Sequence, residues 1–304
     1  FGILRDAYDG KCGKVFGNGL ERSYESHFTI IAAVTPKIYG VGQRHAALGE
    51  RFLKYSMGDN LHHFQESDII SKAIDNVDQD SRIREELARV TGDFLSFNFD
   101  EVDPPKLDSV THLKIIRLAE LGARLRGTVD RDMYREEMMT GRPFAEVGSR
   151  LGIQLSKMAR ALARVRGKDT VGTDEYRIVT KIMLDTVSQR AEDVVRTVWM
   201  SNNEHGMTTD EISTATRYPG TTVRRLLDDL NLLKVMERKG KSGSGFKSTW
   251  ALTSYIRKRI AESGVYDGAV GPKLVIRRGP EPGGTAGPSP GAGPGGRKPP
   301  RKGA

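Results

Sequence analysis

Cysteine and long apolar runs are what this 304-residue chain lacks most. Cys12 is the only cysteine, so no disulfide forms within the chain, and this composition favours a reducing compartment such as the cytoplasm. No stretch of about eighteen consecutive apolar residues occurs, so we predict no membrane-spanning helix. The chain starts at Phe1 and has no signal peptide, which suggests a fragment of a longer protein; processing or cloning would give the same start.

Common catalytic motifs are also missing. Gly240-Lys241-Ser242 has the ending of a phosphate-binding loop, but that loop needs a glycine five positions before Gly240, where Val235 stands. The histidines show no metal-ligand spacing, since adjacent His62 and His63 lack the i, i+4 geometry of a helical zinc site. No Gly-x-Ser-x-Gly elbow occurs. The sequence therefore predicts no metal site and gives no support to esterase chemistry.

Positive charge is in excess, but it is unevenly placed. The net charge is +9, which suits a nucleic acid or another polyanion. From Gly268 on, the chain has seven lysines and arginines and only Glu281 to oppose them, so this segment holds six of the nine net charges. It is also rich in Gly and Pro, and we expect it to be disordered because it has too little apolar surface to bury.

Residues 207–253 have the pattern of a winged helix-turn-helix. Thr208 and Glu211 have the spacing of a capping box, which starts a helix. Tyr218-Pro219-Gly220 breaks that helix, and Thr221 or Thr222 is expected to cap the next one. Apolar residues recur in the second helix at one-face spacing, at Val223, Leu226, Leu227 and Leu230.

The second helix and the following hairpin carry the candidate DNA contacts. The outward positions of the helix are polar or basic, which is typical of a helix that reads a DNA groove. Two strand-like runs, 233–238 and 248–252, flank a Gly/Ser/Lys segment that suits a phosphate backbone. The candidate residues are Thr221, Thr222, Arg224, Arg225, Lys239, Lys241 and Lys247. Two alternatives stay open: a hairpin that is merely kept soluble, and a protein–protein module.

Near the start, Phe28 to Val34 is a nearly continuous apolar run of strand length. Such a run predicts a buried parallel strand, which Thr35-Pro36 would end. Ligand-contacting residues in open α/β sheets sit just past strand ends, so Thr35 is a site candidate.

These residues resemble a known family. Residues 4–10, Gly17-Asn18-Gly19, residues 30–36 and 48–52 look like the back half of the core of AAA-like P-loop ATPases carried by phages and mobile elements. The resemblance implies that Thr35 is the sensor-1 residue, and that Arg51 is an arginine finger with Arg44 as the second candidate. A salt bridge from Arg51 to Glu50 or Asp59 is the alternative. The intact parent would bind ATP and Mg²⁺ and work as a homo-oligomer.

The middle of the chain has helical periodicity over 68–89, 106–126 and 145–166, and a further helix is expected from Thr173 through Val187. Residues 150–165 are similar to the lid helix of minichromosome-maintenance-type ATPases. That similarity implies that Arg150 is sensor 2 and contacts a nucleotide phosphate; a solvated basic helix face is the alternative.

We therefore expect a mostly α protein with a partial α/β ATPase core at 1–60, a helical lid at 61–187, a winged helix-turn-helix at 188–262 and a disordered basic tail at 263–304. The predicted function is the DNA-binding part of an ATP-dependent replication or helicase-like protein. Without the phosphate loop and the magnesium ligands, the chain alone should not hydrolyse ATP. The alternative is a winged-helix transcriptional regulator with a non-catalytic front region.

Overall fold

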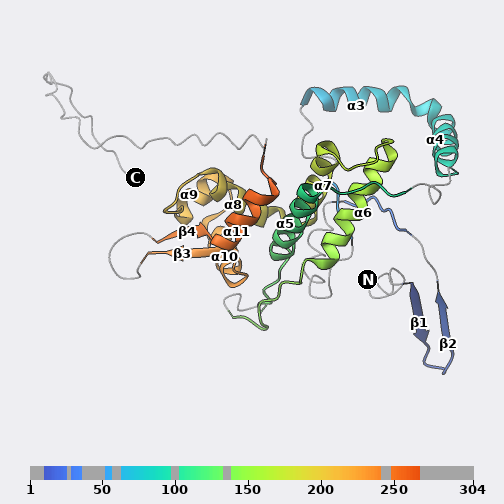
Figure 1. Ribbon diagram of the computed structural model, residues 1–304. Coiled ribbons are helices and arrows are strands. Elements are labelled where there is room, and N and C mark those ends of the chain that lie inside the picture. Colours follow the sequence, from blue (N-terminus) through green and yellow to red (C-terminus); the bar gives the residue numbers. More distant parts are fainter. Residues whose placement is uncertain are drawn as a thin grey trace, which may run out of the picture. The chain divides into compact units, whose positions relative to one another are not determined.

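The computed structural model describes residues 10–25, 29–35, 52–56, 63–96, 103–132, 138–240 and 248–267. The described part is mostly helical, as expected (Figure 1). Its strands are β1 (Lys11–Val15), β2 (Glu21–Glu25), β3 (Met236–Lys239) and β4 (Thr249–Leu252). Its helices are α3 (His63–Asp75), the 3-10 turn η2 (Val77–Gln79), α4 (Asp80–Leu95), α5 (Ser109–Leu125), α6 (Ser149–Val165), α7 (Thr173–Thr186), α8 (Gln189–Met200), α9 (Thr209–Thr216), α10 (Gly220–Leu232) and α11 (Ser254–Ser263).

The named strands pair as two antiparallel hairpins, β1 with β2 and β3 with β4. The expected buried strand over 28–34 is wrong for residues 29–34, which have no regular secondary structure. Ile31 is 96% exposed. An apolar run becomes a buried strand only when neighbouring strands and a covering layer shield it, and no described strand pairs with this segment. The described residues of 1–60 thus contain no parallel sheet of an ATPase core.

The segment expected to be helical over 68–89 is divided in two. α3 ends at Asp75, and η2 then leads into α4. Asn76 marks the break, with φ −91° and ψ −4°. Asparagine competes with helical hydrogen bonding through its own side chain, which favours an interruption at this position.

Helices α5, α6 and α7 pack closely on one another. Gly122 on α5 permits this, because a Cβ at that position would lie 2.7 Å from Cδ2 of Leu151 on α6 and 3.0 Å from Sδ of Met183 on α7. The third predicted helix starts at Ser149 and not at Ala145. Phe144 is held outside it by paired backbone hydrogen bonds with Thr128, of 2.9 and 3.0 Å.

A buried carboxylate holds the loop between α6 and α7. Glu175 is fully buried and accepts hydrogen bonds from Arg166 (2.6 Å), Lys168 (2.9 Å) and the Gly172 amide (2.9 Å). The same loop pairs with the segment before α5, since the Lys106 amide donates to the Asp169 carbonyl at 2.8 Å. Glu175 therefore joins the start of α7 to the end of α6.

Helices α8, α9 and α10 pack on one another, and α10 contacts β3 while α8 contacts β4. The predicted capping box at the start of α9 is confirmed: the Thr208 amide donates to Glu211 at 2.7 Å, and the Glu211 amide donates to Thr208 Oγ1 at 3.2 Å. Met207 adds a further antiparallel bridge beside β4 through Trp250, with N–O distances of 3.0 and 2.7 Å. The order across this small sheet is therefore Met207, β4, β3.

One continuous core of buried side chains runs from α5 to the segment after α11, and α11 packs against α5. Val265 and Tyr266 belong to this core, although the tail was expected from 263. The buried core therefore extends past α11 to Tyr266, two residues before the Gly/Pro-rich segment that begins at Gly268. In the described ranges, no helix has both the length and the apolar character to cross a membrane.

Gly206 is required by the backbone beside β4. Its φ is +81°, and a Cβ there would lie 2.4 Å from the Trp250 carbonyl oxygen. We expect Gly206→Ala to lower the free energy of unfolding by about 2 kcal/mol, because alanine is disfavoured at positive φ and the contact is with backbone. Urea denaturation measures this. Gly17→Ala, where no atom lies within 4 Å of the new Cβ, is the control, and equal stabilities of the two variants would contradict the prediction.

Candidate nucleic-acid interface

The two sides of α10 differ sharply. Val223, Leu227 and Leu230 are buried, and Leu226 is half-buried, as the spacing predicted. The opposite side is a polar exposed stripe that recurs at helical spacing, made of Thr221, Arg224, Arg225, Asp228 and Asn231. We call these five residues the α10 stripe. Its two arginines and one aspartate give it a net positive charge.

Thr221 and Thr222 are not the caps of α10. The residue before the helix is Pro219, without a side-chain cap, and both threonines lie inside the first turn. Proline lacks an amide proton and is well suited to the start of a helix, so α10 begins directly after Pro219, earlier than predicted. Thr221 still belongs to the α10 stripe, whereas Thr222 is half-buried.

The turn between α9 and α10 is tightly fixed. Arg217 ends α9 in the left-handed region, with φ 60°, and its side chain is exposed. Ser213 donates to the Tyr218 carbonyl at 2.7 Å, and the Tyr218 hydroxyl donates to Asp193 on α8 at 2.5 Å. Burial, with that bond to Asp193, raises the pKa of Tyr218 to about 12. The turn therefore holds α10 at a defined angle to α8 and α9.

The β3–β4 hairpin extends beside α10, and Figure 1 shows its two strands side by side. Lys239 at the end of β3 is exposed and donates to the Glu204 carbonyl at 2.9 Å. Lys241 and Lys247, predicted as backbone contacts, lie outside the described residues. The hairpin is anchored by Trp250, which is buried and donates to Thr209 Oγ1 at 3.2 Å.

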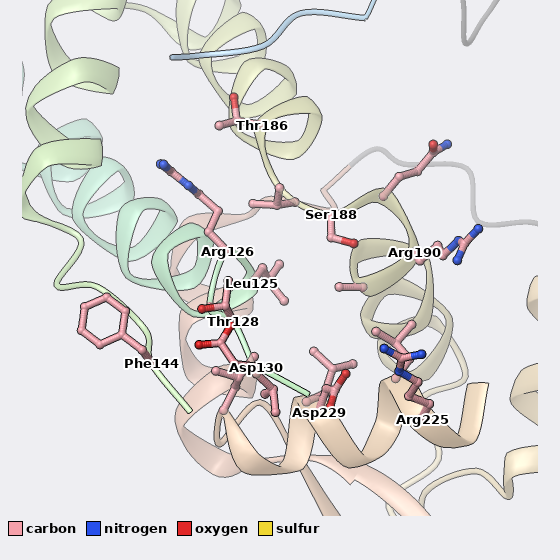
Figure 2. Close-up of a pocket in the computed structure, with 18 of the residues that line it drawn as sticks. Leu125, Arg126, Thr128, Asp130, Phe144, Thr186, Ser188, Arg190, Arg225 and Asp229 are labelled. Carbon is pink, nitrogen blue, oxygen red and sulfur yellow. The ribbon is translucent and has the colours of Figure 1, made fainter. Parts of the chain in front are cut away.

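A cavity of about 740 Å³ lies against α10, and Thr221 and Arg225 of the α10 stripe are among its lining residues (Figure 2). The end of α5, the start of α8 and α10 along its whole length contribute its walls, and Lys54 and Phe144 also line it. Arg131, from the segment that follows α5, pairs with Asp229 of α10 at 2.5 Å. Burial raises the pKa of Asp229, and Arg131 opposes that rise. This ion pair joins the segment after α5 to α10.

The residues predicted for ATP chemistry are not brought together by the described part of the chain. Thr35 is exposed on a segment without regular structure. Arg150 is in the first turn of α6 and lies 3.9 Å from Glu146, an i, i+4 pair. Arg51 and the second candidate, Arg44, lie outside the described residues. The sensor and arginine-finger roles therefore remain predictions.

Sequence reasoning missed Arg190, an exposed arginine in the first turn of α8 that lines the cavity together with Arg225. Nothing in its local sequence pattern marks it. Its position becomes significant only because the fold brings α8 against α10, and with it Arg225, which lies 35 residues further along the chain.

Comparison with protein-family models, with curated proteins and with solved structures found no match to this chain. The described residues also contain no group of three or more His, Cys, Asp or Glu side chains that would hold a metal ion. The α10 stripe and the cavity are thus the features from which a function has to be argued.

Proposed function

We propose that this chain binds double-stranded DNA through a winged helix-turn-helix formed by α9, α10 and the β3–β4 hairpin, with α10 entering the major groove. The observation that carries the proposal is the α10 stripe. Its residues are polar and exposed along the whole helix, while the opposite side is packed into the core. A helix of this kind is held by its apolar side and presents donors and acceptors to base edges and phosphates.

Three other features support this assignment. The turn before α10 is rigid, because Ser213 and Asp193 both bind Tyr218. Arg217 adds an exposed cation at that turn. Strand β3 contacts α10 and ends at the exposed Lys239, a position from which a wing would contact the phosphate backbone. An ATP-dependent replication activity of a longer parent protein stays a prediction from the resemblance.

Arg224→Ala tests the proposal. Arg224 lies in the middle of the α10 stripe and does not line the cavity. We expect the variant to bind a mixed-sequence DNA duplex about 10-fold more weakly, because one arginine contact to a base or phosphate contributes about 1–3 kcal/mol. Fluorescence anisotropy at several salt concentrations gives the affinity and the salt dependence.

Arg177→Ala is the matched control, since Arg177 is exposed on α7 and outside the helix-turn-helix. It should bind the duplex like the unmodified chain. Unchanged affinity and salt dependence of Arg224→Ala would overturn the assignment of α10 as the reading helix. Such a result would favour the alternative that the helix-turn-helix binds another protein.

A further inference from the structure

We propose that residues 63–96 of one chain, which we call the α3–α4 arm, dock on helix α6 of a second copy of the chain. Each copy gives one arm and receives one, so the product is a dimer. The contact joins an acidic helix that has an exposed apolar side to a basic helix that also exposes apolar residues. Both surfaces lie outside α9, α10 and the β3–β4 hairpin, so the contact does not depend on DNA binding.

The α3–α4 arm exposes almost all of its described side chains in a single chain. Every residue of 67–96 is exposed except Ile83, which is half-buried. The exposed residues include large apolar side chains, such as Leu87 at 62% and Val90 at 51%. Helices of 13 and 16 residues, the lengths of α3 and α4, gain most of their stability in water by packing an apolar side. The arm therefore needs a surface that covers it.

The apolar residues of α4 lie on one side of the helix. They recur at intervals of four, three and four residues and form what we call the α4 seam: Ile83, Leu87, Val90 and Phe94. This spacing is typical of helices that pack lengthwise on another helix. Glu86 borders the seam, because it is three residues after Ile83 and four before Val90. The partner of the seam should therefore combine apolar side chains with a cation.

The charge of the whole arm favours the same kind of partner. Residues 63–96 contain eight acidic and four basic residues, a net charge of −4, although the complete chain has a net charge of +9. An acidic surface repels DNA and attracts a basic protein surface. The α3–α4 arm is therefore suited to a basic helix and not to the DNA that α10 is proposed to bind.

Helix α6 has the complementary properties. It contains four basic residues and no acidic one. One side is packed in the core through Leu151, Leu155, Ala159 and Ala163. Exposed positions recur on the opposite side and form what we call the α6 stripe: Ile153, Lys157, Ala161 and Val165. Ile153 is 58% exposed and Val165 is 59% exposed. The core thus holds α6 rigidly while the α6 stripe offers apolar side chains around a lysine.

The two surfaces also match in length and in the order of their groups. The α4 seam is about 16 Å long and the α6 stripe about 18 Å, at the rise of an α-helix. Lys157 stands between the apolar residues of the stripe, as Glu86 stands beside those of the seam. Apolar contact between the two helices would therefore bring opposite charges within reach of each other.

A second copy is the partner that supplies both surfaces. In a single chain the α4 seam and the α6 stripe are exposed at the same time, so they do not cover each other. Two copies that exchange their arms form the same contact twice, which closes the assembly as a symmetric dimer.

Sedimentation velocity of the full chain, without DNA, tests this dimer. We expect a monomer–dimer equilibrium with a Kd of about 10 μM or below. Glu86→Lys and Lys157→Glu should each raise that Kd at least about 10-fold, because like charges then face each other across the contact. The variant that carries both changes restores opposite charges, and its Kd should return to within about 3-fold of the original value.

Glu85→Lys is the matched control for Glu86→Lys. It makes the same change of charge at an exposed position two residues before Leu87, on the side of α4 away from the seam, and should dimerise like the unmodified chain. Arg177→Glu, at an exposed position on α7, is the corresponding control for Lys157→Glu.

Three results would overturn the proposal. They are a chain that stays monomeric up to about 100 μM, an unchanged Kd for Lys157→Glu, and a double variant that dimerises no better than the single variants. An unchanged Lys157→Glu would mean that the α4 seam pairs with a different surface, such as the same seam of the second copy. Arg224→Ala should dimerise normally, so a failure of DNA binding is distinguished from a failure of dimerisation.

Discussion

Replacing Glu175 by alanine should lower the free energy of unfolding by about 2–3 kcal/mol. The carboxylate is fully buried and accepts hydrogen bonds from Arg166, Lys168 and the Gly172 amide. Removing it leaves the amide without this acceptor and separates the ends of α6 and α7. The loss stays below that of a fully buried ion pair, because Arg166 and Lys168 are 39% and 41% exposed and can still reach water.

Asp174→Ala is the matched control for Glu175→Ala. Asp174 is the neighbouring carboxylate on α7, is 67% exposed, and lies 3.8 Å from Arg177. Its loss should change the stability by less than about 0.5 kcal/mol, as for other surface ion pairs. Urea denaturation near neutral pH compares the two variants. Similar stabilities would show that Glu175 does not hold the α6–α7 loop.

Acid should have the same effect as the Glu175 substitution. The hydrogen bond from Lys168, together with that from Arg166, lowers the pKa of Glu175 to about 2. A carboxyl whose pKa is lowered on folding stabilises the protein above its ordinary pKa and loses that contribution as the pH falls toward the lowered value. The stability difference between the unmodified chain and Glu175→Ala should therefore shrink between about pH 4.5 and 2.

The parts of the fold that could be predicted from the sequence are those that depend on near neighbours. Thr208 and Glu211 are three residues apart, so their capping box is visible in the sequence and is present in the structure. The buried face of α10 follows from the spacing of its apolar residues alone. The break at Asn76 was not predicted, since a single polar residue decides it. The start of α6 at Ser149 was not predicted either, since it depends on the backbone pairing of Phe144 with the distant Thr128.

In the candidate site, too, features formed by near neighbours could be predicted and features formed by distant segments could not. Most of the α10 stripe was predicted, because one helix supplies its residues; Asn231 was not predicted, and Thr222, which was, is half-buried. The cavity could not be predicted, since its lining comes from segments as distant as Lys54 and Leu233. The apolar run at 28–34 shows the converse limit: strand-like composition does not make a strand where no described neighbour pairs with it.

A second buried carboxylate, Glu192, has a pKa that is raised, whereas the pKa of Glu175 is lowered. The side chain of Glu192 on α8 is 9% exposed, and its Oε1 atom lies 3.5 Å from Nε of Arg196 without a hydrogen bond. Burial raises its pKa to about 7, and the lowering effect of Arg196 does not cancel this. The carboxylates of Asp193 and Asp185 raise it further, while the nearby Tyr266 hydroxyl lowers it. Glu192 therefore carries a proton in the folded chain under mildly acidic conditions.

The stability of the chain should fall as the pH rises through neutrality because of Glu192. In the unfolded chain this group loses its proton near the ordinary pKa of about 4.5, whereas in the folded chain it keeps the proton up to about pH 7. The folded state thus binds more protons between these values, and raising the pH across them removes up to about 3 kcal/mol of stability.

Glu192→Gln isolates this contribution, since glutamine keeps the shape of the protonated side chain and does not titrate. Urea denaturation of both chains from pH 5 to 8.5 gives the difference in their free energies of unfolding, in which the effects of all other groups cancel. We expect that difference to shift in favour of the variant as the pH rises, by up to about 3 kcal/mol. A difference that stays constant over this range would mean that Glu192 is ionised throughout, with Arg196 and its other neighbours holding the charge inside the core.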